Sequence, residues 1–228
     1  MNVSRETLRK SERELLLKSA STLGVDLSDA QTVRLFEFLK ELRRWNERIN
    51  LIGPASPEEQ VVLHLVDSLA PLKFLPDSPA KVLDLGSGAG LPGLVLAIMR
   101  PQWTVTMVEA RAKKTDFIRY AARKLGLDNV EIRQERLEKG RKAFPEHFFD
   151  VVTFRALGHL KDVLPLVAAY VRDSGLVLAY KGPEGEIEWS ESEPIARKMG
   201  FRLAKTEEII LPLLAHRRTL LFIEPSSR

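Results

Sequence analysis

The chain of 228 residues contains no cysteine. Disulfides, thiolate metal ligands and iron–sulfur clusters are therefore excluded, no metal site is expected, and a reducing compartment is compatible with the composition. No stretch approaches the ~20 consecutive apolar residues that a membrane-spanning helix requires. Residues 1–13 are polar and charged, without the apolar centre of a secretory signal. These features predict a cytoplasmic protein without a membrane partner.

A strong excess of charge of one sign is also missing, because the net charge is only +4. This mild basicity permits a polyanionic partner without requiring one. The cations nevertheless gather in three clusters: Arg43, Arg44 and Arg48; Arg111, Lys113 and Lys114; Arg217 and Arg218. A single cluster of this kind is typical of a solvated helix face or turn. Taken together, the clusters favour RNA as a partner.

Residues 1–76 are predicted to form an N-terminal helical extension. A first helix over residues 4–23 ends at Gly24. Ser28 is the expected N-cap of a second helix, with Gln31 as its capping-box partner. That helix carries one apolar stripe at three- and four-residue steps, formed by Leu35, Phe38, Leu39, Leu42, Trp45 and Ile49. A third helix is expected over residues 57–72, and a linker-like break follows at residues 76–79.

Beyond residue 77 the pattern changes to short apolar runs that alternate with helical stretches. The runs cover residues 81–85, 104–109, 130–133, 150–155 and 175–181, and the first four leave room for crossover helices. Residues 207–213 and 219–223 are typical of a closing antiparallel hairpin. The sequence therefore predicts an α/β fold: a Rossmann-like, mostly parallel sheet over residues 77–228, with helices on both faces and a C-terminal antiparallel hairpin.

Residues 82–93 are rich in glycine at the end of the first predicted strand. Pro92 follows where a helix should begin. Gly86, Gly88 and Gly90 have the spacing G-x-G-x-G, whereas a dinucleotide fingerprint would require glycine at Leu91. One interpretation is a turn that merely needs positive φ angles. The other, which we favour, is a loop that lets a ligand approach the backbone at the carboxyl end of the strand.

The ligand is indicated by two acidic residues. Asp84 precedes the loop, where a carboxylate is poorly placed against a pyrophosphate but suits an ammonium group and a sulfonium. Glu109 ends the second predicted strand and can accept hydrogen bonds from ribose hydroxyls. S-adenosyl-L-methionine carries all three groups. The sequence therefore predicts this cofactor, bound by Asp84, Gly86, Gly88, Gly90 and Glu109.

The residues also narrow the acceptor of the methyl group. Methylation of C5 in a pyrimidine normally needs a cysteine nucleophile, which the chain lacks. Methylation of an exocyclic amine usually goes with an Asn/Asp-Pro-Pro-aromatic loop, whereas residues 153–157 read Thr-Phe-Arg-Ala-Leu. Guanine N7 already carries a free lone pair and needs no general base. The sequence is compatible with N7 methylation but does not demand it.

Several further motifs extend from the second helix to the end of the chain. They are Trp45-Asn46, Asn50-Leu51, His64 with Asp67-Ser68-Leu69, Lys113-Lys114, Arg136-Leu137-Glu138, Arg155-Ala156, Lys181-Gly182 and Arg218. With the glycine-rich segment, they resemble the glucose-inhibited division protein B family, the bacterial 16S ribosomal RNA guanine-N7 methyltransferases. The glycine loop alone would match many methyltransferases, but the Trp-Asn, His-x-x-Asp-Ser and Arg-Ala elements taken together are specific to this family. Ile52 departs from it, because threonine often follows the Asn-Leu pair there.

This resemblance implies site residues that the chemistry alone does not. Implied cofactor contacts are Gly86, Leu91, Leu137, Glu138 and Arg155, and the implied catalytic candidates are Asn46, His64, Asp67, Arg155 and Lys181. Leu137 and Glu138 have the alternative interpretations of a core residue and a surface charge. Lys181 either meets RNA phosphate or caps the sheet, and His64 and Asp67 either line the site or pair on a helix surface.

Arg155 ends the fourth predicted strand, so we expect it to matter more for catalysis than for stability. A structural arginine there would need a partner carboxylate. A site arginine near a sulfonium also needs an intervening negative charge, which Glu138 or the RNA backbone could supply.

The resemblance implies methyl transfer from S-adenosylmethionine to N7 of a guanine in 16S ribosomal RNA, either free or within the small ribosomal subunit, by a monomer. The alternatives are a methyltransferase of a small molecule or protein, and a non-catalytic RNA-binding factor. The N-terminal extension and the basic clusters favour RNA. The glycine-rich loop with Asp84 and Glu109 argues against a non-catalytic role.

Overall fold

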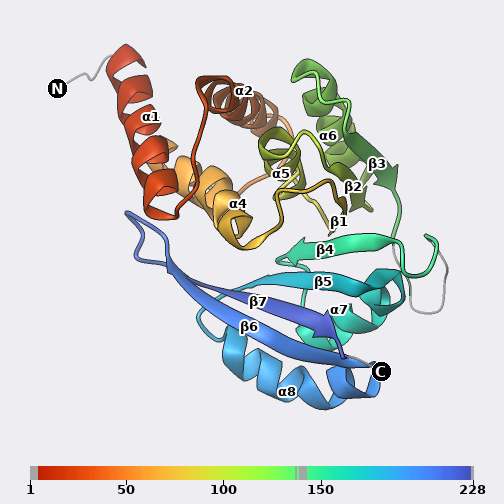
Figure 1. Ribbon diagram of the computed structural model, residues 1–228. Helices are drawn as coiled ribbons and strands as arrows, with labels where there is room; N and C mark the ends of the chain where they lie inside the picture. The colour runs from red at the N-terminus through yellow and green to blue at the C-terminus, as the bar shows by residue number, and fades with distance from the viewer. Residues whose placement is uncertain (1–4, 137, 139–142, 227–228) are drawn as a thin grey trace.

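A computed structural model of the protein describes residues 5–136, 138 and 143–226, and within them a seven-stranded sheet lies at the centre (Figure 1). Its order is β3-β2-β1-β4-β5-β7-β6. The parallel strands are β1 (Lys81–Leu85), β2 (Thr104–Glu109), β3 (Val130–Gln134), β4 (Phe149–Arg155) and β5 (Val171–Lys181). β6 (Phe201–Ile210) and β7 (Arg217–Pro225) form an antiparallel hairpin that joins the sheet at β5. The predicted fold is confirmed.

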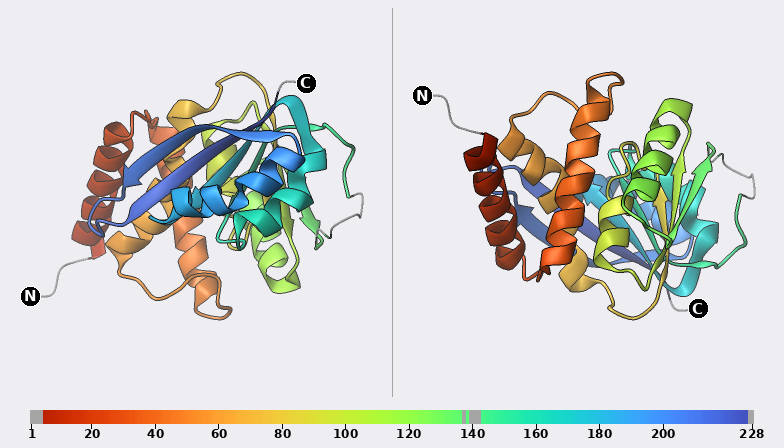
Figure 2. Two further views of the ribbon diagram at one scale, coloured as in Figure 1. Left: turned by 90° about the horizontal axis from the view of Figure 1, so that it is seen from below. Right: turned by 90° about the horizontal axis from the view of Figure 1, so that it is seen from above.

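Helices cover both faces of the sheet, as expected (Figure 2). α5 (Gly93–Met99) and α6 (Ala112–Lys124) lie on one face with the N-terminal helices, and α7 (Leu160–Val167) and α8 (Gly185–Lys198) lie on the other. Because successive side chains of a strand point to opposite faces, each strand contributes residues to the apolar layers on both faces of the sheet. Val82, for example, joins the apolar cluster above the sheet and Leu83 the one below it.

The N-terminal helices follow the predicted signals. α1 (Arg5–Thr22) ends before Gly24, whose φ of +72° lies in the left-handed region that glycine tolerates. α2 (Asp29–Asn46) begins at the predicted capping box, in which Ser28 and Gln31 bond each other's backbone N–H groups. Leu35, Phe38, Leu39 and Leu42 of its apolar stripe are fully buried.

The third helical segment is continuous but not uniform. It consists of α3 (Pro57–Gln60), the π-helical η1 (Val61–Val66) and α4 (Asp67–Leu69), followed by the 3₁₀ turn η2 (Leu72–Phe74). The prediction of one helix over residues 57–72 is therefore close in extent. The π-helical turns lie where Asp67 enters the core, and π-bulges are frequent at functional positions.

The largest differences from the predicted strand boundaries concern β5 and β6. β5 begins at Val171 rather than at residue 175, and β6 covers Phe201–Ile210 rather than residues 207–213. The hairpin register explains the second difference, because Phe201 pairs with Pro225 and the Leu211 N–H donates to the His216 carbonyl at the turn. Residues 211–213 therefore belong to the turn rather than to a strand.

The connection from β3 to β4 contains no helix among its described residues, although a crossover helix had room there. Phe144 occupies the corresponding layer instead. It is buried and packs edge-on against Phe149 and against Tyr170 of η3 (Ala168–Tyr170). α8, for which the pattern made no prediction, covers the neighbouring part of this face.

The N-terminal helices and the sheet share one apolar cluster, which includes Leu16, Phe38, Phe117 and Phe222. The division into residues 1–76 and 77–228 stays a prediction. Among the helices that the structure describes, none combines the length and the apolarity needed to cross a membrane.

Because of this shared cluster, Phe38→Ala should destabilise the whole chain at once. Phe38 is fully buried with its ring 6.3 Å from that of Phe117, so truncation should lower the free energy of unfolding by about 3–5 kcal/mol. Urea unfolding followed by tryptophan fluorescence and by circular dichroism should give one coincident transition. Val33→Ala, at an exposed position of the same helix, should change little. Two separate transitions would contradict the shared core.

Candidate active site

The glycine-rich loop follows β1 at the carboxyl edge of the sheet. Gly86, Gly88 and Gly90 have φ angles of +71°, +58° and +78°, so each lies in the region that favours glycine. The Gly86 N–H donates to the Val108 carbonyl at 2.8 Å, which places the loop beside the end of β2. The need for positive φ is therefore real at all three positions.

A pocket of about 660 Å³ also lies beside this loop, within the range of roughly 300–1,000 Å³ typical of small-molecule sites. Of the predicted cofactor contacts, Gly86, Gly88, Glu109 and Glu138 line it. Its other walls are Leu85, Val108, Ala110, Arg111, Lys114, Glu135, Arg136, Ala156, Leu157 and Leu166. The loop therefore combines its turn geometry with a ligand-sized space.

Asp84 is fully buried beneath the loop. Its Oδ2 accepts a hydrogen bond from the Gly93 N–H at 3.0 Å, and its Oδ1 has no hydrogen-bond partner in the described part of the chain. Burial raises the pKa of Asp84 from 3.8 to about 6, so the carboxylate is mostly ionised at neutral pH. Among the described residues no cation forms an ion pair with Asp84, and Arg155 acts on it only through a weaker contribution than burial. This negative charge below the pocket favours a cationic ligand above it.

Glu109, at the end of β2, holds the other side of the loop. Its Oε2 accepts from the Gly88 N–H at 2.9 Å and its Oε1 from the Arg111 N–H at 2.8 Å. Each carboxylate oxygen retains a lone pair for a further donor. The expectation that Glu109 accepts ribose hydroxyls stays a prediction that this geometry permits.

These features fit S-adenosylmethionine. An ideal Cβ on Gly88 would have only the Gly86 carbonyl oxygen and Lys114 Nζ as neighbours, at 3.8 and 3.9 Å, so the backbone there is open to a ligand. Glu109 lines the pocket at this opening, and Asp84 lies beneath the loop. Their negative charges are complementary to a nucleoside that carries a sulfonium and an ammonium group.

Two predicted contacts, Gly90 and Leu91, pack toward the apolar core instead of facing the pocket. Leu91 is buried in the apolar cluster, and an ideal Cβ on Gly90 would lie 2.5 Å from Leu94 Cδ1. Neither residue lines the pocket. Leu137 lies outside the described residues. Glu138 is exposed at the pocket wall, which agrees with a surface charge and with a ligand contact alike.

Asp67 forms an ion-paired junction of three elements. Its fully buried carboxylate accepts from Arg155 Nη1 at 2.9 Å and from Arg218 Nε at 2.8 Å. Arg155 Nη1 also donates to the Leu63 carbonyl at 3.0 Å. α4, the end of β4 and the start of β7 are therefore joined at one carboxylate.

The junction changes the interpretation of Arg155. The carboxylate beside it is Asp67, not Glu138, and the Arg155 side chain is only 18% exposed. The structural interpretation therefore has the partner carboxylate that it needs. That Arg155 matters more for catalysis than for stability stays a prediction. The sequence placed Arg218 in a basic cluster and in a family motif, and no local signal reveals its partner 151 residues away.

The interpretation of His64 and Asp67 as a pair on the helix surface is wrong, because both side chains are buried. Neither ring nitrogen of His64 has a hydrogen-bond partner among the described residues. Burial, with a smaller contribution from Arg155, lowers the pKa of His64 from 6.5 to about 4. The imidazole is therefore neutral at pH 7, and it does not line the pocket.

Lys181 makes the contacts expected of a residue that caps the sheet, and its role toward RNA stays a prediction. Its Nζ donates to Glu188 at 2.6 Å and to the Gly158 carbonyl at 2.7 Å, and the side chain is 9% exposed. The ammonium thus ties β5 to α8 and to the loop after β4. No local pattern indicates Glu188 as the partner, because only the fold brings α8 to this lysine.

Asn46 closes a loop. Its Oδ1 accepts from the N–H groups of Leu51 and Ile52, at 2.8 and 2.9 Å, and so fixes the chain after α2. The structure does not bring it to the pocket. Of the five catalytic candidates, only Arg155 and Asp67 meet each other directly.

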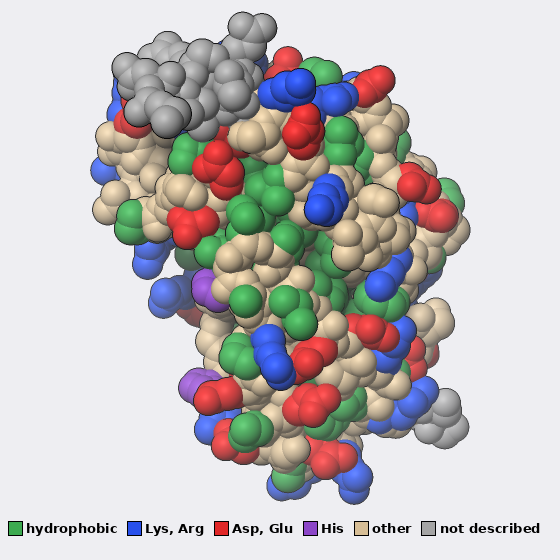
Figure 3. Space-filling model, turned by 90° about the vertical axis from the view of Figure 1, so that its left-hand side faces the viewer, with side chains coloured by type: hydrophobic (Ala, Val, Ile, Leu, Met, Phe, Trp, Pro, Cys, Tyr) green, Lys and Arg blue, Asp and Glu red, His purple; other side chains and the backbone are tan. Residues whose placement is uncertain are grey.

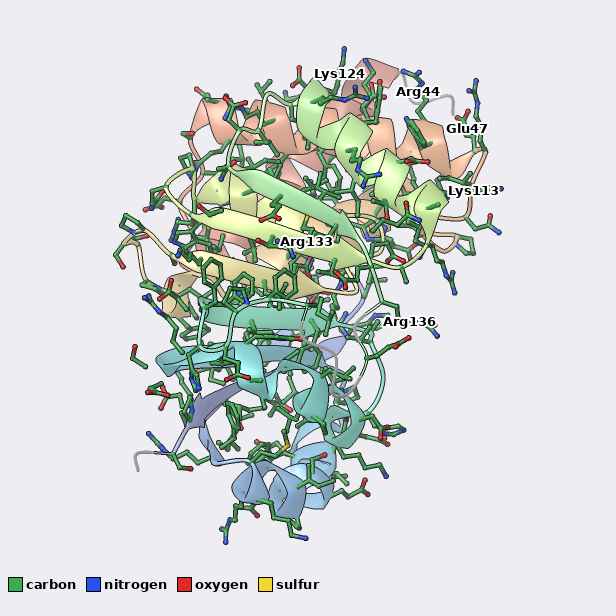
Figure 4. All side chains as sticks on the ribbon, turned by 90° about the vertical axis from the view of Figure 1, so that its right-hand side faces the viewer. Arg44, Glu47, Lys113, Lys124, Arg133 and Arg136 are labelled. Atoms are coloured by element: carbon green, nitrogen blue, oxygen red, sulfur yellow. The ribbon has the colours of Figure 1, made fainter. Side chains whose placement is uncertain are left out.

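The three basic clusters separate in the structure. Arg43 and Arg44 pair with Glu12 and Glu41, and Arg217 lies 3.6 Å from Glu208. Figure 3, which faces the side of α1 and the β6–β7 turn, shows acidic and basic side chains interspersed there. Among the described residues, no ion pair is formed by Arg111, Lys113, Lys114 or Arg136, which follow the ends of β2 and β3 in the chain. Figure 4 shows Lys113 and Arg136 projecting from this side of the molecule.

Comparison with known proteins gives consistent matches over most of the chain. Residues 31–215 match the model of the family described as rRNA small subunit methyltransferase G. A relative from Syntrophotalea carbinolica, named ribosomal RNA small subunit methyltransferase G, is 39% identical over 89% of this chain and 93% of its own length. A relative of the same name from Deinococcus radiodurans is 38% identical over 96% of this chain and 87% of its own length.

Solved structures share the fold at low sequence identity. A SAM-dependent methyltransferase from Aquifex aeolicus superposes with a TM-score of 0.55 at 18% identity, over 81% of this chain and 97% of that one. This likeness supports the Rossmann-like fold without addressing the acceptor.

The junction predicts a large stability cost for Asp67→Asn. The neutral amide leaves Arg155 and Arg218 without their shared counter-charge, so the free energy of unfolding should fall by about 3 kcal/mol. Asp29→Asn breaks the exposed pair with Arg13 and should cost less than about 1 kcal/mol. Chemical denaturation of both variants checks this difference. Equal, small costs would show that the junction contributes little to stability.

Proposed function

Because the chain belongs to the rRNA small subunit methyltransferase G family, we propose that its methyl acceptor is N7 of a guanine in 16S ribosomal RNA. The enzyme is an S-adenosylmethionine-dependent methyltransferase with a Rossmann-like fold. The proposal concerns the atom that is methylated, the form of the RNA substrate and the residues that serve the reaction.

The observation that carries the proposal is that three of the predicted catalytic candidates are not free to act as a general base. Asp67 is held between two arginines, His64 is buried with its pKa lowered to about 4, and Lys181 is bonded to Glu188. Acceptors that must lose a proton before methylation need such a base. Guanine N7 does not, because its lone pair is free.

S-adenosylmethionine held in this pocket would supply an electrophilic methyl group, activated by its sulfonium. N7 would accept this group through its free lone pair, without loss of a proton, so that a positive charge would remain on the guanine ring. The enzyme must therefore position the two reactants and stabilise the charge on the ring.

Different residues of this chain serve cofactor binding, charge stabilisation and positioning. We assign Glu109 to the ribose hydroxyls and Glu138 to the edge of the adenine ring. Asp84 contributes its negative charge below the loop, which favours the cationic cofactor. Arg155, held by Asp67, orients the loop of residues 156–158, and two residues of that loop line the pocket.

The RNA is expected to approach the carboxyl edge of the sheet. Arg111, Lys113 and Arg136 form no ion pair in the described chain, and cations in this state attract phosphate. Lys113 and Arg136 project from this side of the molecule (Figure 4). The helices of residues 5–76 border the same edge through the Asp67 junction. We further propose that the enzyme works in the cytoplasm as a monomer on 16S RNA or the small subunit.

Methyl transfer to 16S RNA tests the acceptor atom. Unmodified small subunits, incubated with the enzyme and an isotopically labelled methyl donor, should gain one label that borohydride and aniline convert into a strand break at a guanine. Gly86→Ala is the control: a Cβ there would lie 2.5 Å from Leu157 Cδ1 at a φ of +71°, so cofactor binding and the label should be lost. Label on an exocyclic amine, on protein or on a small molecule would contradict the proposal.

Cofactor affinity should depend on pH through Asp84. Its pKa is raised to about 6, so the carboxyl takes up a proton as the pH falls through that value and the negative charge below the loop disappears. Binding of S-adenosylmethionine should therefore weaken, by at most tenfold per pH unit. Calorimetry of the wild-type protein and of Asp84→Asn checks this. The variant should bind weakly at every pH, and a wild-type affinity unchanged across pH 6 would contradict the role of Asp84.

A further inference from the structure

Lys114 occupies an unusual place at the pocket. It lies in the first turn of α6 and lines the pocket, and its Nζ is 3.9 Å from an ideal Cβ on Gly88. The side chain is half-buried, and among the described residues its ammonium forms no ion pair. A cation thus stands directly at the open backbone of the glycine loop.

The positive charge of Lys114 needs an explanation, because the cofactor of this pocket is itself cationic at two groups. Glu109, Glu135 and Glu138 line the pocket and Asp84 lies beneath it, whereas the two other cations that line it, Arg111 and Arg136, are exposed. A cation among these acids opposes the sulfonium and the ammonium of the cofactor and does nothing for the ribose. The α-carboxylate of the methionyl tail is the one anionic group of S-adenosylmethionine, and it is complementary to a lysine.

We propose that Lys114 binds this α-carboxylate and thereby makes the pocket selective for nucleosides that carry an amino-acid tail. The proposal rests on S-adenosylmethionine as the cofactor of the proposed function. Gly88 supports it, because the missing side chain leaves the space through which the ammonium reaches the ligand. Lys114 is then a binding residue of the site, in addition to the residues that the sequence indicated.

The neighbouring cations fit a different task. Arg111 and Arg136 line the rim of the pocket, and Lys113 projects from the edge of the molecule without lining it (Figure 4). These exposed charges suit RNA phosphate. Lys113 is also the matched control for Lys114, since it has the same chemistry one position earlier in the same helix turn.

Calorimetric titration of Lys114→Gln and Lys113→Gln with two ligands tests the proposal. S-adenosylhomocysteine carries the carboxylate, whereas 5′-methylthioadenosine has the same nucleoside without the amino-acid tail. Lys114→Gln should weaken S-adenosylhomocysteine roughly tenfold or more, as loss of a charge-assisted hydrogen bond implies. Its affinity for methylthioadenosine should stay within about twofold of wild type, and Lys113→Gln should match wild type with both ligands. Lys114→Arg should restore most of the affinity for S-adenosylhomocysteine.

Two results would overturn the proposal. An equal weakening of both ligands would show that Lys114 only maintains the loop, and unchanged affinities would show that it does not touch the tail. The proposed function is judged separately. Wild-type protein that binds S-adenosylhomocysteine but leaves 16S RNA unmethylated would refute the RNA acceptor while leaving the role of Lys114 standing.

Discussion

One buried carboxylate, that of Asp67, sets how the N-terminal helices meet the sheet. A desolvated negative charge is costly unless cations surround it, and Arg155 and Arg218 meet this need from two different strands. The pairing fixes the helical segment of residues 57–69 against the carboxyl edge of the sheet. It also fixes the end of β4, from which the loop of residues 156–158 continues to the pocket wall. The place where acceptor and cofactor meet therefore depends on this junction.

The glycine loop is held by a second pair of carboxylates with a different arrangement. Asp84 accepts the N–H of Gly93 from below, and Glu109 accepts the N–H of Gly88 from the side of β2. Both acids shape the loop before any ligand binds, and both leave negative charge next to the pocket. Preorganised charge of this kind suits a cationic cofactor and the positive ring that forms during N7 methylation. Asp84 and Glu109 therefore both hold the glycine loop in place and provide the negative charge next to the pocket.

The sequence predicted what depends on local pattern. The capping box at Ser28, the stop at Gly24, the apolar stripe of α2 and the three positive-φ glycines all follow from neighbours a few residues apart. The roles of Lys181, Asn46 and His64 did not follow, because each depends on a partner or an environment that only the folded chain creates. Residue identity indicated that these positions matter, but not that Lys181 and Asn46 serve the architecture.

Hydrogen exchange in the native state tests most directly whether the Asp67 junction organises this edge. In Asp67→Asn, amide exchange should accelerate together in η1 and α4, in the loop of residues 155–159 and at the start of β7, because all three depend on the same carboxylate. Exchange in the glycine loop of residues 86–93, which Asp84 and Glu109 hold, should stay as in the wild type. Acceleration confined to α4, or spread evenly over the glycine loop as well, would contradict the account.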